Sequence, residues 1–555
     1  MRQFSLRLWS LVLISSALQI LCFPVAGPVP SWRAAICWVA LAPLLFALTC
    51  RTPDGKPVTI KLGFLLGYLS GIVWYFGNCY WIYETMHTYG GIAKPAAAGI
   101  LLLFCLYLGL YHALFGAVIS GINGALGKQP ALLFSPFVWV AVEIARSRIT
   151  GFPWDLLGIA QIDNPLLTRL APFTGAYGLS FIIAAVNALW LVRIILKQRR
   201  HTRAVLVVAA VIAVVLYVTC LRRLQTSDDE RTSAVATLVQ ENLTVGAPAA
   251  AEGSLTHSQM LRAFSALSLF PPSTQACDGI PELPSTHCGT PSLAQQGTPT
   301  AFLASTDLIV WPEAPNNFFE EDPDFRESLS RLARTTRAPV IAGNIGVTSN
   351  HSVARGYDLY NSAEFIQPDG TFAARYDKMH LVPFGEYVPY KQLFFFAGSL
   401  LQDVGVFDPG KKRVIFTSGG HSYGTFICYE SIFGDEVRQY ARLGAQVLVN
   451  ISDDGWYGDT SAAWEHLNQV RMRAIENHRW VVRATNTGVT AVIDPAGRVT
   501  AAIPRHIRSS LHAGFNYEYD VTFYAGHGDL FAWLCVAVTL AGLGWSAVLT
   551  RRLVQ

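Results

Sequence analysis

Charged residues are scarce in this sequence, at 14% of its 555 residues, whereas soluble domains usually carry about 25%. The formal net charge is only +4, which argues against a nucleic-acid-binding surface, because such surfaces are strongly basic. The C-terminal half also lacks the paired cysteine and histidine spacing that is typical of zinc sites. These absences leave a chain dominated by apolar residues, which make up 52% of it.

The apolar residues gather in runs of membrane-spanning length, about 20 residues. We predict eight transmembrane helices, near residues 6–24, 31–50, 61–81, 95–121, 129–146, 174–196, 203–221 and 529–549. The first run could be a signal peptide, but no small-residue cleavage site follows it, so we expect an anchor. The stretch between the seventh and eighth runs has the scattered charges, turns and short apolar segments of a soluble domain.

Lysine and arginine orient the predicted spans, because cytoplasmic segments carry an excess of them. With the N-terminus inside, twelve of these residues lie on inner segments: Arg2, Arg7, Arg51, Lys56, Lys61, Lys128, Lys197, Arg199, Arg200, Arg203, Arg551 and Arg552. Seven lie on short outer segments: Arg33, Lys94, Arg146, Arg148, Arg169, Arg222 and Arg223. We therefore expect both termini in the cytoplasm, seven helices in 1–223, an extracytoplasmic domain in 224–528, and the eighth helix with a tail in 529–555.

The cysteines of the predicted outer domain are few. Of ten in the chain, seven lie in or beside apolar spans, where they act as small hydrophobes. Cys277 and Cys288 flank the proline-rich stretch "CDGIPELPSTHC" within an insert at about 270–300, and in an oxidising compartment they can pair. Cys428 is then the odd cysteine, which makes it a candidate for a reactive thiol.

The outer domain reads as an α/β sandwich, because short buried strands are interleaved with helical patterns. Strands are expected at 234–240, 306–313, 338–344, 359–370, 423–430 and 445–454, a helix at 462–480, and two more strands within 481–499. Glu313 and Cys428 each close an expected strand, and Lys378 lies in a nearby loop. Taken singly, these residues are more often a solvated cap, a packed thiol and a surface lysine.

Together the three residues make a workable nucleophilic site. A cysteine thiol needs a base or a nearby cation to become a thiolate. Glu313 can take the proton, and Lys378 can stabilise the thiolate and then a tetrahedral oxyanion. If a helix begins at Cys428, the backbone N–H of Tyr429 would point at the same oxyanion.

Three motifs carry a resemblance to a known superfamily. "WPEAP", "RYDKMHLVPFGEYVP" and "GTFICYES" occur in this order and resemble the Glu-Lys-Cys signatures of the nitrilase, or carbon–nitrogen hydrolase, superfamily. Set between seven spans and one, they resemble the apolipoprotein N-acyltransferase family. The resemblance extends to the membrane segments "GYLSGIVWYFGNCYWIY" (67–83) and "RITGFPWDLLG" (148–158) and to "NISDDGWYGDTSAAWEHL" (450–467).

The resemblance implies a fold, an activity and roles. The fold would be a polytopic helical bundle carrying an αββα nitrilase-like domain. Cys428 would accept an acyl chain from a phospholipid, with Glu313 as general base and Lys378 as oxyanion stabiliser. The acyl group would pass to the α-amine of a diacylglyceryl-cysteine at the N-terminus of an apolipoprotein, the last step of lipoprotein maturation. The family reaction is ping-pong and uses no cofactor, and we expect a monomer in the bacterial inner membrane with a periplasmic catalytic domain.

The resemblance also marks supporting residues and two departures. Glu386 matches the glutamate beside the triad, and Tyr429 and Glu430 match the residues after the family's cysteine. The family often has a tryptophan shortly after its first strand, but "VQENLTVGAPAAAEGS" (239–254) has none. The insert at about 270–300 is the second departure. Both concern acceptor or lid details and leave the triad intact.

Three alternatives stay open at this point. A membrane-tethered amidase or nitrilase-type hydrolase would use the same triad but pass the acyl group to water. Against it, Phe394, Phe395 and Phe396 follow the "VPFGEYVP" loop and suit a lid dipping into the outer leaflet, although a buried core helix would look the same. A transporter or receptor would need charges or broken helices at the membrane midplane, which these spans lack. A Cys–His site using His380, His421 or His466 remains, but thirteen histidines place one near any cysteine by chance.

Overall fold

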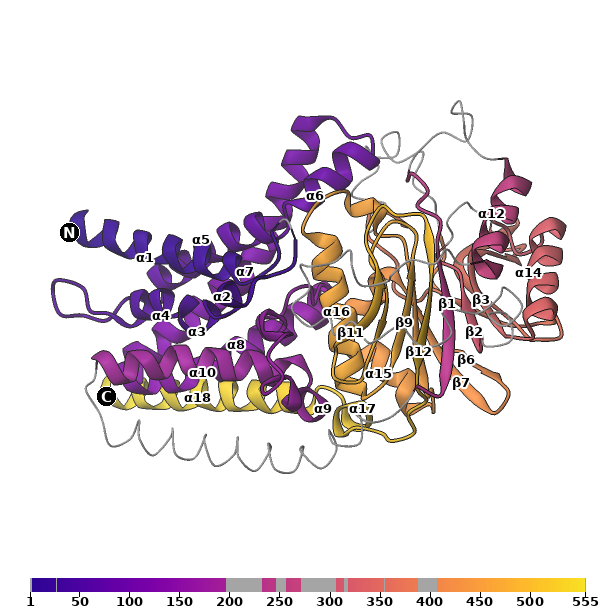
Figure 1. Cartoon of the computed structure of the whole chain (residues 1–555). Coiled ribbons are helices and arrows are strands. Elements are labelled where there is room, and N and C mark those ends of the chain that lie inside the picture. The colour runs from indigo at the N-terminus through magenta and orange to yellow at the C-terminus, as the bar shows by residue number, and fades with distance from the viewer. Residues whose placement is uncertain are drawn as a thin grey trace.

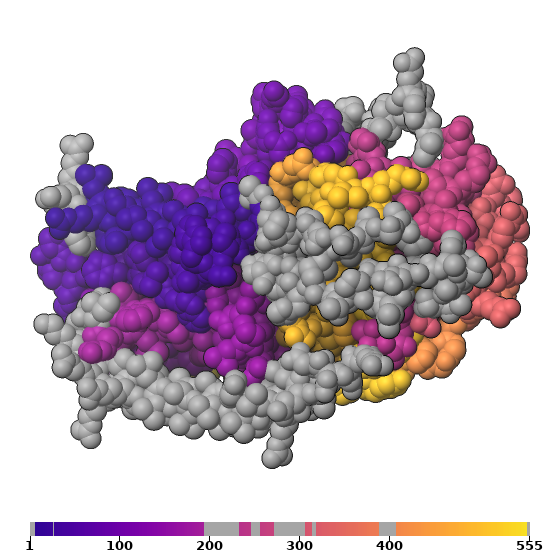
Figure 2. Space-filling view, in the orientation of Figure 1, coloured from indigo at the N-terminus to yellow at the C-terminus, as the bar shows by residue number. Residues whose placement is uncertain are grey.

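The computed structural model describes residues 2–25, 27–195, 232–245, 256–270, 306–313, 318–353, 355–387 and 407–554. These residues form two parts that lie side by side (Figure 1). One is a bundle of apolar helices, and the other is a pair of β-sheets with helices outside them. In Figure 2 the indigo atoms of the N-terminal residues lie on the left, and the pink, orange and yellow atoms of the sheet domain lie on the right.

The bundle is built from the N-terminal helices and the last helix. They are α1 (Arg2–Leu21), α2 (Ser31–Ala34), α3 (Cys37–Ala40), α4 (Ala42–Thr49), α5 (Ile60–Asn78), α6 (Trp81–Glu84), η1 (Thr85–Tyr89), α7 (Lys94–Leu126), α8 (Lys128–Ala145), η2 (Arg146–Thr150), η3 (Leu157–Gln161), η4 (Thr168–Leu170), α9 (Ala171–Thr174), α10 (Ala176–Ile195) and α18 (Leu530–Val554). Six helical stretches are long and apolar enough to cross a membrane, and α1 holds a shorter one, Leu6–Leu21. Helices therefore occupy seven of the expected spans, and the expected span 203–221 lies outside the described residues.

The expected helix at 31–50 is broken into α2, α3 and α4. Pro43 stands in the first turn of α4, where a missing backbone N–H costs nothing. In the middle of a continuous helix the same proline would remove a hydrogen bond and clash with the preceding turn. The expected span is present, because Ser31–Thr49 forms one helical stretch of 19 residues that is long and apolar enough to cross a membrane.

Glycines bring α5 and α7 into close contact. Gly63, Gly67 and Gly71 recur at every fourth position of α5 and share one face. A Cβ atom at Gly67 would lie 2.2 Å from the carbonyl oxygen of His112, and one at Gly116 of α7 would lie 2.2 Å from that of Gly63. Such small-residue stripes let the backbones of membrane helices approach and pack by van der Waals contact. The four-residue spacing of these glycines is visible in the sequence alone.

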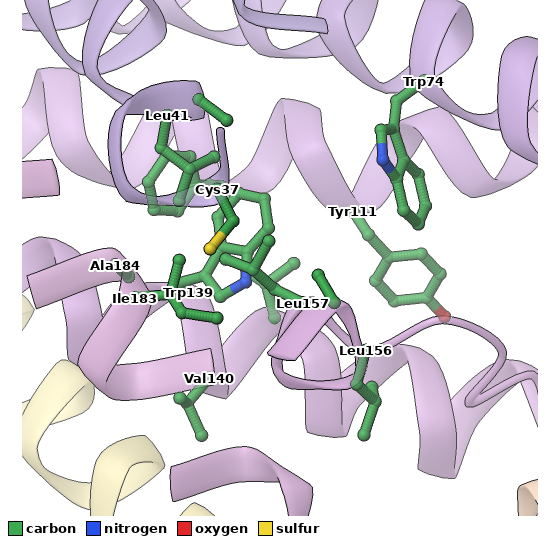
Figure 3. Packing of buried hydrophobic residues seen from close by; sticks show 14 of the residues in the cluster. Cys37, Leu41, Trp74, Tyr111, Trp139, Val140, Leu156, Leu157, Ile183 and Ala184 are labelled. Atoms are coloured by element: carbon green, nitrogen blue, oxygen red, sulfur yellow. The ribbon is translucent and has the colours of Figure 1, made fainter. Parts of the chain in front are cut away.

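The centre of the bundle is a continuous apolar core. Figure 3 shows Trp74, Tyr111 and Trp139 from different helices together with Leu156 and Leu157. The two leucines come from the segment 151–158 after η2, and each is buried. This segment therefore anchors its C-terminal half in the bundle while Trp154 reaches towards the sheet domain, where its indole packs on His466.

The sheet domain contains two six-stranded sheets. The first has the order β12-β1-β2-β3-β4-β5 and the second β11-β10-β9-β8-β7-β6. The strands are β1 (Ala234–Gln240), β2 (Leu308–Val310), β3 (Val340–Ser349), β4 (Tyr357–Ile366), β5 (Phe372–Asp377), β6 (Ile415–Ser418), β7 (His421–Ile427), β8 (Val447–Ser452), β9 (Val481–Thr485), β10 (Thr490–Ile493), β11 (Val499–Ile503) and β12 (Ser509–Phe515). β1 pairs with β12 in antiparallel register from Ala234 opposite Phe515 to Gln240 opposite Ser509, so the two ends of the domain meet.

Helices cover the outer face of each sheet, which gives an αββα sandwich. α12 (His257–Leu269) and α14 (Pro323–Thr336) pack outside the first sheet. α15 (Gly434–Arg442) and α16 (Ala462–Asn477) pack outside the second, and the short η7 (Cys428–Ile432), η8 (Asp454–Tyr457) and α17 (Phe523–His527) complete that side. The nitrilase-like α/β class expected from the sequence is confirmed.

α16 separates the second sheet from the membrane helices (Figure 1). All its residues except Trp464 are buried, including its charged ones. Arg471 forms a 2.6 Å ion pair with Asp163 of the bundle, and Glu476 accepts a 2.9 Å hydrogen bond from the backbone N–H of Ala176. α16 thus joins the sheet domain to the bundle, and it is buried on both of these sides.

The expected strands match the observed ones in the centre of each sheet. β1 has the expected bounds, and the strand expected at 359–370 ends at Ile366 because "QPDG" forms a turn. β5, β6, β11 and β12 were not expected. All four lie at sheet edges, where one side of the strand is open and the apolar pattern that identifies a strand is weak.

Candidate active site

Cys428 stands on a sharp turn between β7 and η7. β7 runs parallel to β8, and the carboxyl ends of parallel strands are where α/β sheets place their sites. The backbone of Cys428 has φ +49°, a left-handed conformation that costs a non-glycine residue about 1–2 kcal/mol. The residue is 6% exposed, and its thiol is hydrogen-bonded to Ser452. The expected helix start at this cysteine is present as a 3₁₀ turn.

Lys378 lies between two carboxylates, next to this turn. Its Nζ atom is 3.0 Å from Oε1 of Glu313 and 2.9 Å from Oε1 of Glu386. Asn361 of β4 donates to the same two oxygen atoms, at 2.7 and 2.6 Å. Lys378 is 1% exposed, so the sequence-based impression of a surface lysine was wrong. The structure therefore brings Glu313, Lys378 and Glu386 together from segments 65 residues apart.

The backbone fixes the second oxygen of each carboxylate. The N–H of Asp453 donates to Oε2 of Glu313 at 2.9 Å, and the N–H of Val382 donates to Oε2 of Glu386 at 2.7 Å. Sequence reasoning missed Asp453 and Asn361. A polar residue within the apolar strand pattern at 359–366 was the available signal for Asn361, because a buried amide needs partners.

The charges of the site follow from this geometry. Burial alone would lower the pKa of Lys378, but Glu313 and Glu386 outweigh it and hold that pKa well above its usual value. Burial raises the pKa of Cys428, and Glu313 adds to the rise, while Lys378 opposes it. Burial and Glu313 therefore favour the protonated thiol, and Lys378 favours the thiolate.

Glu430 joins the turn of Cys428 to the loop of Lys378. One carboxylate oxygen accepts hydrogen bonds from the hydroxyl of Tyr376 at 2.7 Å and from the backbone N–H groups of Met379 and His380 at 2.7 and 3.1 Å. The other accepts from the N–H of Ile427 at 2.8 Å. A carboxylate that holds four donors on both segments is a clamp that sets the spacing between nucleophile and lysine.

The Tyr429 side chain points towards the membrane part. Its hydroxyl donates to the carbonyl oxygen of Gly151 at 3.3 Å, and its ring packs edge-on against Phe433. Any oxyanion contact from this residue therefore has to come from its backbone N–H.

The three candidate histidines are placed apart from the Cys428 thiol. His466 contacts the carbonyl oxygen of Cys428, at 2.9 Å from Nε2. His380 stacks on Phe433, and His421 stacks on Tyr517. Among the charged side chains, Glu313 is the one whose charge has the largest effect on the pKa of the Cys428 thiol, and it raises that pKa.

Several expected features lie outside the described residues. They are the lid residues Phe394, Phe395 and Phe396, the cysteines Cys277 and Cys288, and most of the insert at 270–300. The segment 246–254, where the family tryptophan is missing, belongs to the same group.

Comparison with known proteins gives two matches that together span most of the chain. Residues 15–189 match the apolipoprotein N-acyltransferase N-terminal domain, and residues 236–512 match the carbon–nitrogen hydrolase family. The apolipoprotein N-acyltransferase of Geobacter metallireducens is 32% identical over 95% of this chain and 93% of its own length. The chain belongs to the apolipoprotein N-acyltransferase family.

A second apolipoprotein N-acyltransferase agrees with this assignment. The apolipoprotein N-acyltransferase of Methylococcus capsulatus is 31% identical over 89% of both chains. Among solved structures, Saccharomyces cerevisiae Nit3, a member of the nitrilase superfamily, covers 51% of this chain and 90% of its own at 17% identity and a TM-score of 0.33. As a member of the apolipoprotein N-acyltransferase family, the chain is an enzyme of the carbon–nitrogen hydrolase superfamily.

Proposed function

We propose that this protein transfers an acyl chain from a phospholipid to the α-amine of the S-diacylglyceryl-cysteine at the N-terminus of apolipoproteins. The observation that carries the proposal is the contact of Glu313 and Lys378 beside the turn of Cys428. Family membership supplies the acyl acceptor, through the names of the relatives. Burial of the site beside a bundle of apolar helices supports a lipid as the donor.

The first half-reaction forms a thioester. Glu313 takes the thiol proton while the sulfur of Cys428 attacks the carbonyl carbon of the phospholipid ester. Lys378 and the backbone N–H of Tyr429 stabilise the oxyanion of the tetrahedral intermediate. The C–O bond then breaks, Glu313 returns the proton to the glycerol oxygen, and a lysophospholipid leaves.

The second half-reaction forms an amide. The neutral α-amine, whose ordinary pKa is near 8, attacks the thioester carbon, and the same donors stabilise the second oxyanion. Glu313 takes a proton from the amine as the C–S bond breaks, and the Cys428 sulfur leaves and recovers its proton. The first half-reaction leaves the sulfur as a thioester, and the second restores the neutral thiol, so the complete cycle consumes no cofactor.

The membrane topology is part of the proposal. Eight spans with both termini in the cytoplasm would place residues 224–528 in the periplasm and 1–223 and 529–555 in the bacterial inner membrane. Both described termini lie at the end of the bundle away from the sheets (Figure 1), which supports an even number of crossings. Alkaline phosphatase fused after residue 350 should be active and after residue 200 inactive; the opposite result would reverse the orientation.

The deciding experiment is intact-protein mass spectrometry of the full chain purified from a bacterial membrane. The acyl-enzyme adds one acyl mass to the Cys428 peptide, and hydroxylamine removes it, because thioesters react with hydroxylamine. Adding a synthetic diacylglyceryl-cysteine peptide should move that mass to its α-amine. Release as free fatty acid instead would indicate a hydrolase, and absence of acylation would contradict the proposal.

A further inference from the structure

A second cluster of charged side chains contacts the backbone of the Cys428 turn. His466 of α16 is 0% exposed, and its Nε2 atom is 2.9 Å from the backbone carbonyl oxygen of Cys428. A carbonyl oxygen only accepts hydrogen bonds, so Nε2 carries the hydrogen. The nucleophile is thus held from below by a donor that does not touch its sulfur.

The position of the His466 ring is fixed on all sides. Nδ1 is 2.9 Å from Oδ1 of Asp454 and 3.3 Å from the guanidinium of Arg483, which forms a 2.6 Å ion pair with the other oxygen of Asp454. Burial would raise the pKa of Asp454, but Arg483 and His466 hold it far below its usual value. The indole of Trp154 stacks on the imidazole at 6.0 Å with an angle of 8°. The ring is therefore held from the catalytic domain and from the membrane segment together.

The carbonyl of Cys428 sets the direction of the next N–H group. A peptide unit is planar and trans, so its C=O and N–H bonds point in opposite directions. The C=O of Cys428 and the N–H of Tyr429 belong to one such unit. Because His466 holds the carbonyl on the α16 side, the N–H is turned to the opposite side. The left-handed backbone of Cys428 makes this restraint necessary, because a non-glycine residue is disfavoured in that conformation.

We propose that His466 is a positioning residue that aims the Tyr429 N–H at the oxyanion by holding the Cys428 carbonyl. The role rests on the proposed acyl-transfer function only in needing an oxyanion; it adds no proton transfer to the sequence of steps. Loss of the Nε2 donor lets the peptide rotate, and a displacement of about 1 Å in such a group can lower a rate about 100-fold. Alkylation of the thiol by iodoacetamide passes through no oxyanion and should not show this loss.

The test compares two reactions of Cys428 in the full chain in detergent. One is acylation by a short-chain p-nitrophenyl ester, and the other is alkylation by iodoacetamide, both followed on the Cys428 peptide by mass spectrometry. His466→Leu should acylate about 100-fold more slowly and alkylate at a rate within about threefold of the unmodified protein. His421→Leu, which removes a histidine stacked on Tyr517, is the matched control and should change neither rate.

The conservative variants decide between a donor and a packing role. The amide nitrogen of glutamine reaches about as far as Nε2, whereas that of asparagine reaches only as far as Nδ1. His466→Gln should therefore acylate at least tenfold faster than His466→Asn. Equal rates for these two variants, or parallel losses of acylation and alkylation in His466→Leu, would overturn the proposal. If His466→Leu does not fold, the Gln and Asn pair gives the same decision.

The p-nitrophenyl ester tests the role of His466 independently of the proposed phospholipid donor. A protein that reacts with the ester but never with phospholipid would contradict the phospholipid donor and still measure the effect of His466. Unchanged acylation in all three His466 variants would contradict the positioning role and leave the acyl-transfer proposal standing.

Discussion

Two charged clusters flank Cys428, and they use similar side chains for different ends. The Lys378 cluster (Glu313, Asn361, Lys378 and Glu386) holds one cation between two carboxylates. The His466 cluster (Asn450, Asp454, His466 and Arg483) pairs one carboxylate with a guanidinium and an imidazole. The charges of Glu313 and Lys378 have larger effects on the pKa of the Cys428 thiol than that of Asp454. The hydrogen bond from the second cluster goes to the backbone carbonyl of Cys428.

The role of each cluster therefore depends more on which atoms of Cys428 it acts on than on which side chains it contains. Both clusters are buried, and both would be very costly to leave half-paired. The Lys378 cluster has one carboxylate more than it has cations, whereas the single carboxylate of the His466 cluster is ion-paired with Arg483. Substitutions that separate chemistry from scaffolding therefore test the comparison.

The largest effect is expected at Cys428 and Glu313. Cys428→Ser and Cys428→Ala remove the sulfur that we propose carries the thioester, and Glu313→Gln removes the proposed proton acceptor while keeping the shape of the side chain. We expect no hydroxylamine-sensitive acyl mass in any of the three. Near-normal acylation in Glu313→Gln would mean that another group is the base.

Lys378→Met should slow both half-reactions about 100- to 1000-fold, the usual effect of losing one oxyanion donor. Methionine keeps the length of the side chain, and one of the two remaining carboxylates can take up a proton in place of the lysine charge. Single-turnover rates of thioester formation and of transfer to a diacylglyceryl-cysteine peptide measure the two halves. If only one half slows, the lysine serves one leaving group rather than both oxyanions.

Arg483→Met should act mainly on stability. Arg483 is 0% exposed and pairs with Asp454 at 2.6 Å, so its loss leaves a buried carboxylate uncompensated, at about 3–5 kcal/mol of unfolding free energy. Denaturant unfolding of the full chain in detergent measures the change. If Arg483→Met kept its unfolding free energy but lost acylation activity, Arg483 would take part in the reaction. The two clusters would then not differ in role.

The smallest effect is a pH dependence set by Asp453. Burial and the neighbouring Glu313 raise the pKa of Asp453 to about 7, so its carboxyl is neutral below that pH and charged above it. The added negative charge makes Glu313 a stronger base, so acylation by the p-nitrophenyl ester should rise through about pH 7. Asp453→Asn should flatten this step, by less than about tenfold, the equivalent of one pKa unit. A step that persists unchanged in Asp453→Asn would assign it to another group.

The sequence predicted one cluster and missed the other for physical reasons. Glu313, Lys378 and Cys428 follow strands, at points where a polar residue after an apolar run stands out. His466 and Arg483 lie inside a helix and a strand that have ordinary patterns, and their proximity depends on how the second sheet packs on α16. From the sequence, His466 was an alternative partner for the Cys428 thiol. In the structure its Nε2 atom instead contacts the backbone carbonyl oxygen of Cys428.

The first sheet can be completed only after β12 has been synthesised, because β12 pairs with β1. Gln240 pairs with Ser509, and at about 5–20 residues per second the roughly 270 residues between them (509 minus 240) take tens of seconds to make. Until then one edge of β1 is open, and open edges invite pairing with other chains. α18 begins at Leu530 and packs on α7 and α8, so the last membrane helix emerges directly after β12. The first sheet and the membrane bundle are therefore closed by the same final stretch of the chain.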